Sequence, residues 1–235
     1  MTRNFSSLFI FISSIAIATV LGSSPASAVS KAHVITFGKW TTVPLFVGPE
    51  EKQKVEIKIR PLMVDTRVKE FTTGDPHDVT DRLFVVRKAY RLNDWLPDDP
   101  DNKTHRWKWQ RGGWLLVDRS SGRVAPLNLP LFDPFYSNAV WFRDFAGYCG
   151  ISDNGERVFA MVAQLGRKKP VVKQELGKAK GNDTPDSECA TPEWQREPTR
   201  VTFQQTGGQK VVFTIHAHAT EMATKDDSDA DDDAK

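Results

Sequence analysis

The feature that most constrains the fold is a series of short apolar segments between residues 111 and 165, each closed by a polar turn. Residues 114–117 are apolar, a polar turn ends at Gly122, and residues 123–125 are largely apolar again. A glycine in such a turn supplies the positive φ that other residues adopt only with strain. Apolar runs on either side of a short turn are typical of a β-hairpin, so this stretch predicts antiparallel sheet.

A second hairpin is predicted around Asn154-Gly155, which separates residues 146–151 from residues 158–163. Asn-Gly favours a two-residue hairpin turn because both residues tolerate positive φ. Residues 158–163 are apolar at odd and even positions, as expected of a central strand covered on both faces. A buried helix is the alternative for so short a run, but its β-branched and aromatic residues favour a strand.

Two predictions concern the first half of the chain. Residues 55–60 alternate apolar and charged side chains, as a strand with one wet face does, and Pro61 is expected to end that strand or to lie at a sheet edge. Residues 72–81 are predicted to form a polar loop that contains Asp75, His77 and Asp78. A histidine between carboxylates could transfer a proton or bind a metal; the alternative is that these residues only form a turn.

Residues 1–28 are predicted to be a secretory signal peptide. Arg3 supplies the positive end, residues 8–21 are apolar, and Ala26-Ser27-Ala28 is a small-x-small cleavage site. A retained membrane anchor is the alternative, although the apolar run is shorter than the roughly 20 residues that a spanning helix needs. We therefore expect a secreted or periplasmic protein with no membrane span after the signal peptide is removed.

The end of the chain is strongly acidic: residues 221–235 contain seven acidic residues and two lysines. Such a segment cannot bury apolar surface, so we expect a disordered tail. Residues 29–220, the predicted folded domain, carry only a small positive excess. A small excess in an exported protein predicts no nucleic-acid partner.

The chain has two cysteines, Cys149 and Cys189. Export would place them in an oxidising compartment, where disulfides persist, so we expect a Cys149–Cys189 bond. The alternative is one buried and one free thiol. Residues 177–198 are rich in Lys, Asp, Pro and Gly and are predicted to form a mobile loop that Cys189 ties down.

The candidate ligand-binding residues are Trp107, Trp109 and Arg111. On a strand, Trp107 and Trp109 share a face, and an exposed Trp pair beside cations can stack on sugar rings. The alternative is that the pair belongs to the core. These residues predict a protein or glycan partner in the cell envelope.

The last predicted hairpin covers residues 200–219, with a Gly-Gly turn near its middle. His216 and His218 lie two residues apart, so on a strand they point to one side and could bind a metal together with a third ligand. The sequence identifies no third ligand, and we expect no bound metal or other cofactor.

No local signature of catalysis is present: the sequence has no G-x-S-x-G, no H-E-x-x-H and no phosphate-binding loop. We therefore assign no catalytic residue and expect a non-catalytic protein. A carboxylate- or metal-dependent hydrolase of the envelope is the alternative, because two carboxylates far apart in sequence leave no local pattern.

Three strand–glycine–strand units recur around Gly122, Gly166 and Gly208, spaced by 44 and 42 residues. Residues 139–177 resemble one blade of the β-propeller repeat proteins, which implies repeated four-stranded antiparallel units. A β-sandwich of long hairpins explains the same pattern without repeats. The predicted fold is thus a single all-β domain of antiparallel hairpins over residues 29–220, either propeller-like or sandwich-like.

Overall fold

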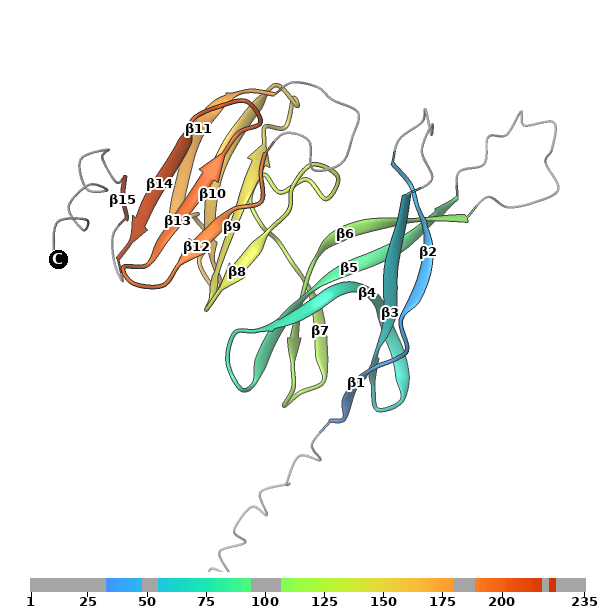
Figure 1. Cartoon of the computed structure of the whole chain (residues 1–235). Coiled ribbons are helices and arrows are strands. Elements are labelled where there is room, and N and C mark those ends of the chain that lie inside the picture. Colours follow the sequence, from blue (N-terminus) through green and yellow to red (C-terminus); the bar gives the residue numbers. More distant parts are fainter. Residues whose placement is uncertain (1–32, 48–54, 94–106, 180–188, 217–219, 223–235) are drawn as a thin grey trace, which may run out of the picture. The chain divides into compact units, whose positions relative to one another are not determined.

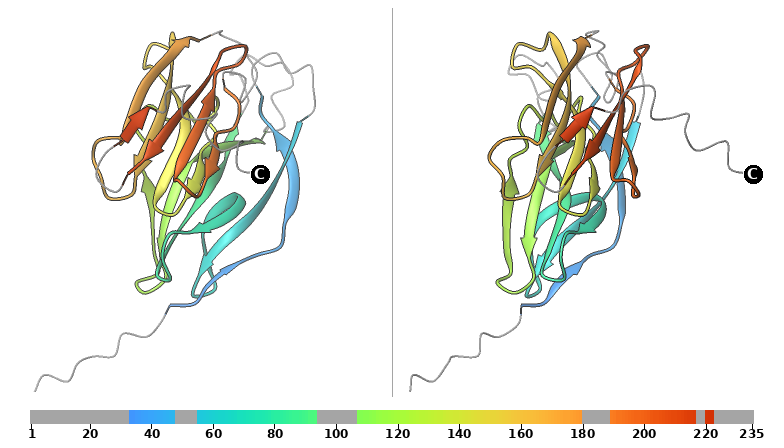
Figure 2. Two further views of the ribbon diagram at one scale, coloured as in Figure 1. Left: turned by 60° about the vertical axis from the view of Figure 1, so that its left-hand side comes forward. Right: turned by 90° about the vertical axis from the view of Figure 1, so that its left-hand side faces the viewer.

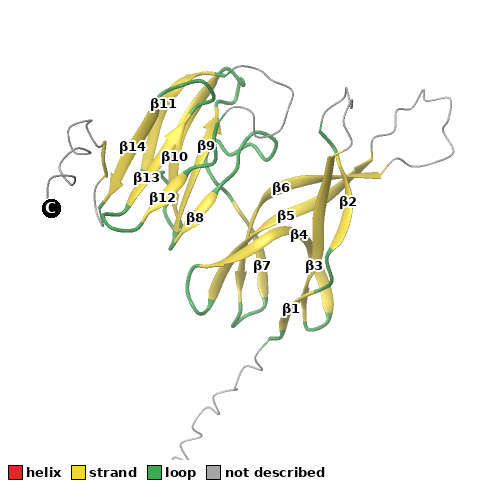
Figure 3. Cartoon of the chain, viewed as in Figure 1, coloured by secondary structure: helices red, strands yellow, loops and turns green. Residues whose placement is uncertain are grey.

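The computed structural model describes residues 33–47, 55–93, 107–179, 189–216 and 220–222. Within these ranges the chain forms fifteen β-strands. Figures 1 and 3 show the strands and no helix. The predicted all-β class is therefore confirmed. The predicted signal peptide, residues 1–28, lies outside the described residues.

The first sheet is formed by seven strands: β1 (Ile35–Phe37), β2 (Thr41–Leu45), β3 (Val55–Val64), β4 (Arg67–Asp78), β5 (Leu83–Asn93), β6 (Trp107–Asp118) and β7 (Arg123–Leu127). Strands β2 to β6 pair in sequence order, each antiparallel to the next.

The same sheet closes on itself, because β2 also pairs with β6. Leu45 is the register partner of Trp109, and Phe46 N donates a hydrogen bond to Trp109 O at 2.8 Å. Four successive antiparallel pairings bring β6 back to the direction of β2, so the closing pair has to be parallel, as it is. Figure 2 shows this sheet from two further directions. The sequence does not predict the closure.

Residues of this sheet form two apolar clusters. The register partners Phe84 and Val117 belong to one cluster, together with Leu62. The second cluster lies toward the β2–β6 seam and contains Leu45, Ile57, Ile59 and Ala89. Burial of Ile57 and Ile59, with Glu56 and Lys58 exposed between them, confirms the alternation predicted for residues 55–60.

Pro61 does not end its strand, so the first of the two predicted alternatives was wrong, whereas the second, a position at a sheet edge, holds locally. On one side it pairs with Phe71 of β4. On the other side it lies between the last partner of β1, Leu62, and the first partner of β2, Ile59. The missing N–H of proline therefore falls where the neighbouring strand is interrupted, and Pro61 O accepts a hydrogen bond from Gly38 N at 2.9 Å.

The predicted polar loop over residues 72–81 was also wrong, because β4 continues to Asp78. The strand absorbs its turn-forming residues in a bulge: Thr73 pairs with Arg87 and His77 with Val85, which leaves two extra residues on β4. Gly74 has a φ of 68° in this bulge. Thr73 Oγ1 donates to Lys58 O at 2.9 Å, which fixes β4 to β3 just before the bulge.

The second sheet is an antiparallel meander of β8 (Val140–Phe142), β9 (Phe145–Ile151), β10 (Arg157–Gln164) and β11 (Val172–Lys178). Strand β10 lies between β9 and β11 and is buried on both faces. Val158 and Val162 pack in one cluster, while Met161 packs in another with Val85 and Trp114 of the first sheet. The prediction of a doubly covered strand is confirmed, except that Phe159 is only half-buried.

The third sheet is a second antiparallel meander, formed by β12 (Glu193–Gln195), β13 (Arg200–Gln204), β14 (Lys210–Ile215) and β15 (Thr220–Met222). The β13–β14 pair confirms the last predicted hairpin. Val201 and Phe203 pack against Val158 and Val162 of the second sheet.

Residues 221 and 222, at the start of the predicted acidic tail, belong to β15. Residues 223–235 lie outside the described residues. The second sheet has the four strands that a blade-like unit implies, whereas the first sheet has seven. The structure is thus β-rich with several sheets, and it does not establish a propeller.

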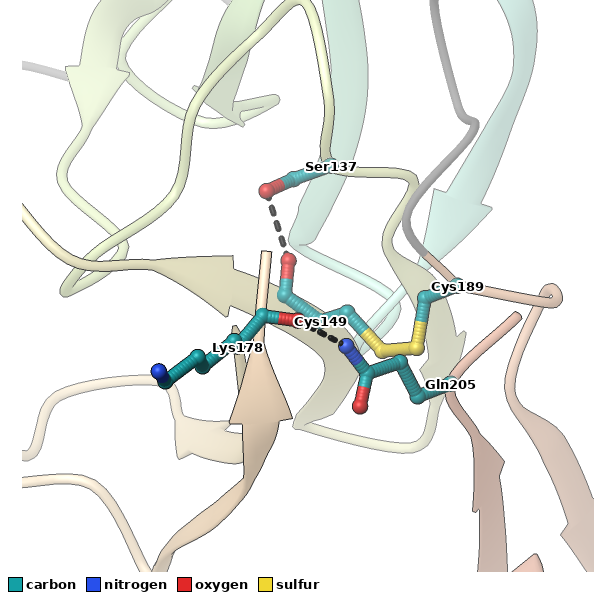
Figure 4. Close-up of a disulfide and its surroundings, with 5 residues drawn as sticks. All are labelled: Ser137, Cys149, Lys178, Cys189 and Gln205. Carbon is teal, nitrogen blue, oxygen red and sulfur yellow. Dashed lines mark hydrogen bonds between the residues drawn. A yellow bond between two sulfur atoms is a disulfide. The ribbon is translucent and has the colours of Figure 1, made fainter. Parts of the chain in front are cut away.

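The predicted disulfide links Cys149 of β9 to Cys189, with 6.2 Å between their Cα atoms (Figure 4). Beside it, Gln205 Nε2 donates to Lys178 O at 2.5 Å and Ser137 Oγ donates to Cys149 O at 2.6 Å. These bonds join β9, the end of β11 and the end of β13. These contacts bear on the predicted mobile loop, residues 177–198. Its first residues belong to β11, Cys189 forms the disulfide, and residues 193–195 form β12. Residues 180–188 lie outside the described residues.

Candidate functional site

The candidate site lies on β5 and β6, next to the seam where the ring closes. Trp109 pairs with Arg91, and Trp107 pairs with Asn93. Register partners and alternate residues of a strand share a face, so Trp107, Trp109 and Arg91 project from the same side of the sheet. The structure therefore confirms that the two tryptophans share a face.

The two tryptophans differ in burial. Trp109 is half-buried: it packs against the cluster that contains Leu45 and Ala89, and its ring meets Phe71 edge-on at 5.1 Å between centroids. Trp107 is 48 % exposed and is absent from every buried cluster of the described residues. The interpretation of the pair as core thus holds for Trp109, while about half of the surface of Trp107 is exposed to solvent.

Arg91 is the residue of this site that the sequence does not single out. Its guanidinium carbon lies 5.4 Å from the centroid of Trp107 and 5.6 Å from that of Trp109. A guanidinium over an aromatic face is attracted by the ring quadrupole, so Arg91 and the two rings hold one another in place. Arg91 itself is exposed.

Arg111 lies two residues further along β6, opposite Ala89. It is half-buried and lines a shallow hollow on the surface. The hollow is lined by Leu45, Phe46, Gln110, Arg111, Pro134 and Phe135. The three predicted ligand-binding residues are thus brought together along one strand, with the hollow at the end that Arg111 occupies.

Asp75, His77 and Asp78 do not converge on one point. Asp75 pairs with Arg60 at 3.6 Å, and Asp78 pairs with Arg119 at 2.6 Å. His77 Nε2 donates to the backbone oxygen of Arg143 at 2.8 Å, and its ring stacks on Trp141. Each side chain therefore has its own structural partner on a different element.

The proposed histidine pair cannot be assessed as a pair. His216 follows β14 and is exposed, while His218 lies outside the described residues. Across the described part of the chain, no three His, Cys, Asp or Glu side chains gather closely enough to hold a metal ion. The same residues contain no helix with the length and apolar character needed to cross a membrane.

Arg87 is a buried charged residue that sequence reasoning missed. It is 6 % exposed and donates hydrogen bonds to Pro134 O at 2.8 Å and Ser137 O at 3.1 Å. It thereby holds the connection between β7 and β8 against β5. Arg87 lies on the face of β5 opposite Val86. In the sequence it looks like one more charged residue of the strand, so its burial is not apparent there.

Three ionisable groups have clearly shifted pKa values, and all three shifts have structural causes. Hydrogen bonds from Arg82, at 2.8 Å from Nε to Asp118 Oδ1, and from Ser120 hold the pKa of Asp118 far below its usual range, and the same contact with Asp118 raises the pKa of Arg82. Burial raises the pKa of Tyr148, whose hydroxyl donates to Pro130 O at 2.7 Å. None of the three groups belongs to the tryptophan site, so none marks it as a place of proton transfer.

Comparison with known proteins returned no similarity: no family model, no curated protein sequence and no solved structure matches this chain.

Proposed function

We propose that this chain is a non-catalytic binding domain that holds a glycan against Trp107 and Trp109. The observation that carries the proposal is the exposure of Trp107, 48 %, on a strand where Arg91 fixes its ring. A large exposed aromatic ring costs solvation free energy unless a partner covers it. Indole faces pack well against the C–H face of a sugar, and rigid aromatic residues are frequent binding hot spots.

The residues around Trp107 support its role in a binding surface rather than in the packing of the core. Trp109 packs on Phe71 and on the apolar cluster that contains Leu45 and Ala89. The binding platform, defined as Trp107 and Trp109, is therefore anchored to the core through Trp109. A preformed platform loses little side-chain entropy when a ligand binds. A hydrolase is not proposed, because Asp75, His77 and Asp78 have separate partners.

The Cys149–Cys189 bond supports a place outside the cytoplasm, where disulfides persist. We propose that the domain is secreted or periplasmic and that the mature chain begins at Val29. N-terminal sequencing of the exported protein tests this. A chain retained in the membrane fraction with residues 1–28 attached contradicts it.

The binding proposal is tested by screening the full protein against a glycan array, then titrating the best glycan by isothermal calorimetry. Trp107→Ala should weaken binding by about tenfold or more, because loss of a hot-spot aromatic residue commonly costs over 1.4 kcal/mol.

The matched control is Trp40→Ala. Trp40 is 42 % exposed and also stacks on an arginine, Arg60, at 4.1 Å, but it lies before β2 and away from the site. Its replacement should leave the affinity unchanged. Equal affinities of Trp107→Ala and the parent protein would contradict the assigned site, and a lack of glycan binding by the parent would contradict the function.

A further inference from the structure

We infer that the glycan recognised at this site is anionic, and that Arg91 binds its carboxylate or sulfate group. The inference rests on the proposed function, since it names the class of ligand that the tryptophan platform takes. Three observations carry it: the position of Arg91, the lack of acidic residues on its face of the sheet, and the absence of a carboxylate partner for Arg91 among the described residues.

The position of Arg91 leaves its hydrogen-bond donors available. The guanidinium lies over the faces of Trp107 and Trp109, 5.4 and 5.6 Å from their centroids. Contacts of this kind use the faces of the guanidinium and the rings, whereas the five N–H groups point outward in the guanidinium plane. That planar fork matches a carboxylate or a sulfate in a bidentate manner. An acidic sugar that stacks on Trp107 would bring its anionic group to this edge.

The face of the sheet that carries Arg91 has no negative charge among the described residues. The residues that share this face through register pairing and alternation on β2 to β6 include Thr41, Val43, Leu45, Val55, Ile57, Ile59, Phe71, Thr73, Ala89, Asn93, Trp107, Trp109 and Arg111. None of these residues is acidic. None of them therefore repels an anion bound at Arg91.

Three other arginines are neutralised: Arg82 pairs with Asp118, Arg119 with Asp78, and Arg157 with Glu175. Arg143 stacks on Phe142 and, like Arg91, has no carboxylate partner among the described residues. For Arg91, no carboxylate partner is found within the part of the chain that the structure describes; its recorded contacts there are the two indole rings. An arginine that is held in position and left without a carboxylate fits an external anion.

The test compares two matched oligosaccharides, one containing uronic acid and the same one with its carboxyl groups reduced to alcohols. Isothermal calorimetry with the full protein should show at least tenfold tighter binding of the acidic sugar, with an affinity that falls as salt is added. Arg91→Gln should remove this preference, so that the variant binds the acidic and the reduced sugar with equal affinity. Arg91→Lys should keep part of the preference, since it retains the charge and loses the fork.

The matched control is Arg143→Gln, which removes an exposed arginine stacked on Phe142 at 5.1 Å, outside the site. It should keep the full preference, which separates local recognition from net charge. Equal affinity of the parent for both sugars, or an equal preference in Arg91→Gln, would overturn the inference and leave the proposed function standing. Binding of neither sugar by a parent protein that also binds no glycan on the array would overturn both. Binding of a single-stranded oligonucleotide as tightly as the acidic sugar would overturn the assignment to a glycan.

Discussion

The packing of the third sheet on the second depends on Phe203, and its replacement by alanine should destabilise the protein strongly. Phe203 is fully buried in the middle of β13. Its ring meets Phe213 edge-on at 6.0 Å and contacts the cluster that contains Val158 and Val162. Truncation of such a side chain leaves a cavity between the two sheets.

The expected loss in the free energy of unfolding is about 3–5 kcal/mol, the usual cost of Phe→Ala in a core. For a domain of this size each kcal/mol lowers the melting temperature by roughly 2–4 °C, so Tm should fall by roughly 6–20 °C. Total stability of a domain is typically about 5–15 kcal/mol, so the variant should still fold. Differential scanning calorimetry of the oxidised protein measures the shift.

Phe159→Ala is the matched control, because it removes the same atoms from a half-buried position on β10. The Phe159 ring is partly covered by Lys173, whose Nζ lies 5.2 Å from its centroid. Its loss should therefore lower Tm by clearly less than the loss of Phe203. A shift of Phe203→Ala within a degree or two of the parent, or equal shifts of both variants, would refute face-to-face packing of the second and third sheets.

Three further predictions concern single contacts. Cys189→Ser opens a loop of 40 residues and should cost about 4 kcal/mol in the chain-entropy estimate; a reductant should lower the urea midpoint of the parent by the same amount and leave that of the variant unchanged. Gly122→Ala should cost about 2 kcal/mol or more, because Gly122 has a φ of 64° and an added Cβ would lie 2.8 Å from His33; if it cost no more than Gly155→Ala, whose φ is 73° and whose Cβ would be in open space, the predicted clash would be wrong. Asp118→Asn should lower Tm at pH 7, and the difference from the parent should shrink progressively as the pH falls below about 4, since a carboxylate whose folded pKa is depressed stabilises fully above its unfolded pKa and loses this contribution as the pH falls toward the folded pKa; a difference that is the same at pH 3 and pH 7 would show that ionisation of Asp118 is not its cause.

The hairpins could be predicted from the sequence because their information is local. Gly122 and Gly155 have positive φ in the turns that the sequence marks, and β10 is covered on both faces as its apolar residues indicate. For Pro61 the sequence left a strand end and an edge position open, because the choice depends on a neighbour that the sequence does not show: the adjacent strand is interrupted opposite it. The bulge at Gly74 misled for the same reason, since turn-forming residues are also the ones that a bulge uses.

The candidate site was likewise predictable from the sequence only where the information is local. Trp107 and Trp109 could be placed on one face from their spacing alone. Arg91 could not be assigned to them, because the register of β5 against β6 decides which residue lies across from Trp109, and that register shifts at a bulge near Arg87. A charged residue in an apolar strand indicates a special position. The sequence alone does not distinguish Arg87, which holds a buried connection, from Arg91, which faces solvent.

Closure of the ring has a consequence for the order of folding. Every other pairing in the first sheet joins strands that are next or next but one along the chain, whereas Leu45 and Trp109 are separated by the whole of β3, β4 and β5. A contact across so long a segment forms only after its loop-closure entropy has been overcome. The hairpins should therefore form before the ring closes, and Leu45→Ala should speed unfolding while leaving the folding rate nearly unchanged. The same seam should exchange its amide hydrogens early, at Phe46 N before the amides of β5, so the platform of Trp109 stands beside the part of the ring that opens most readily.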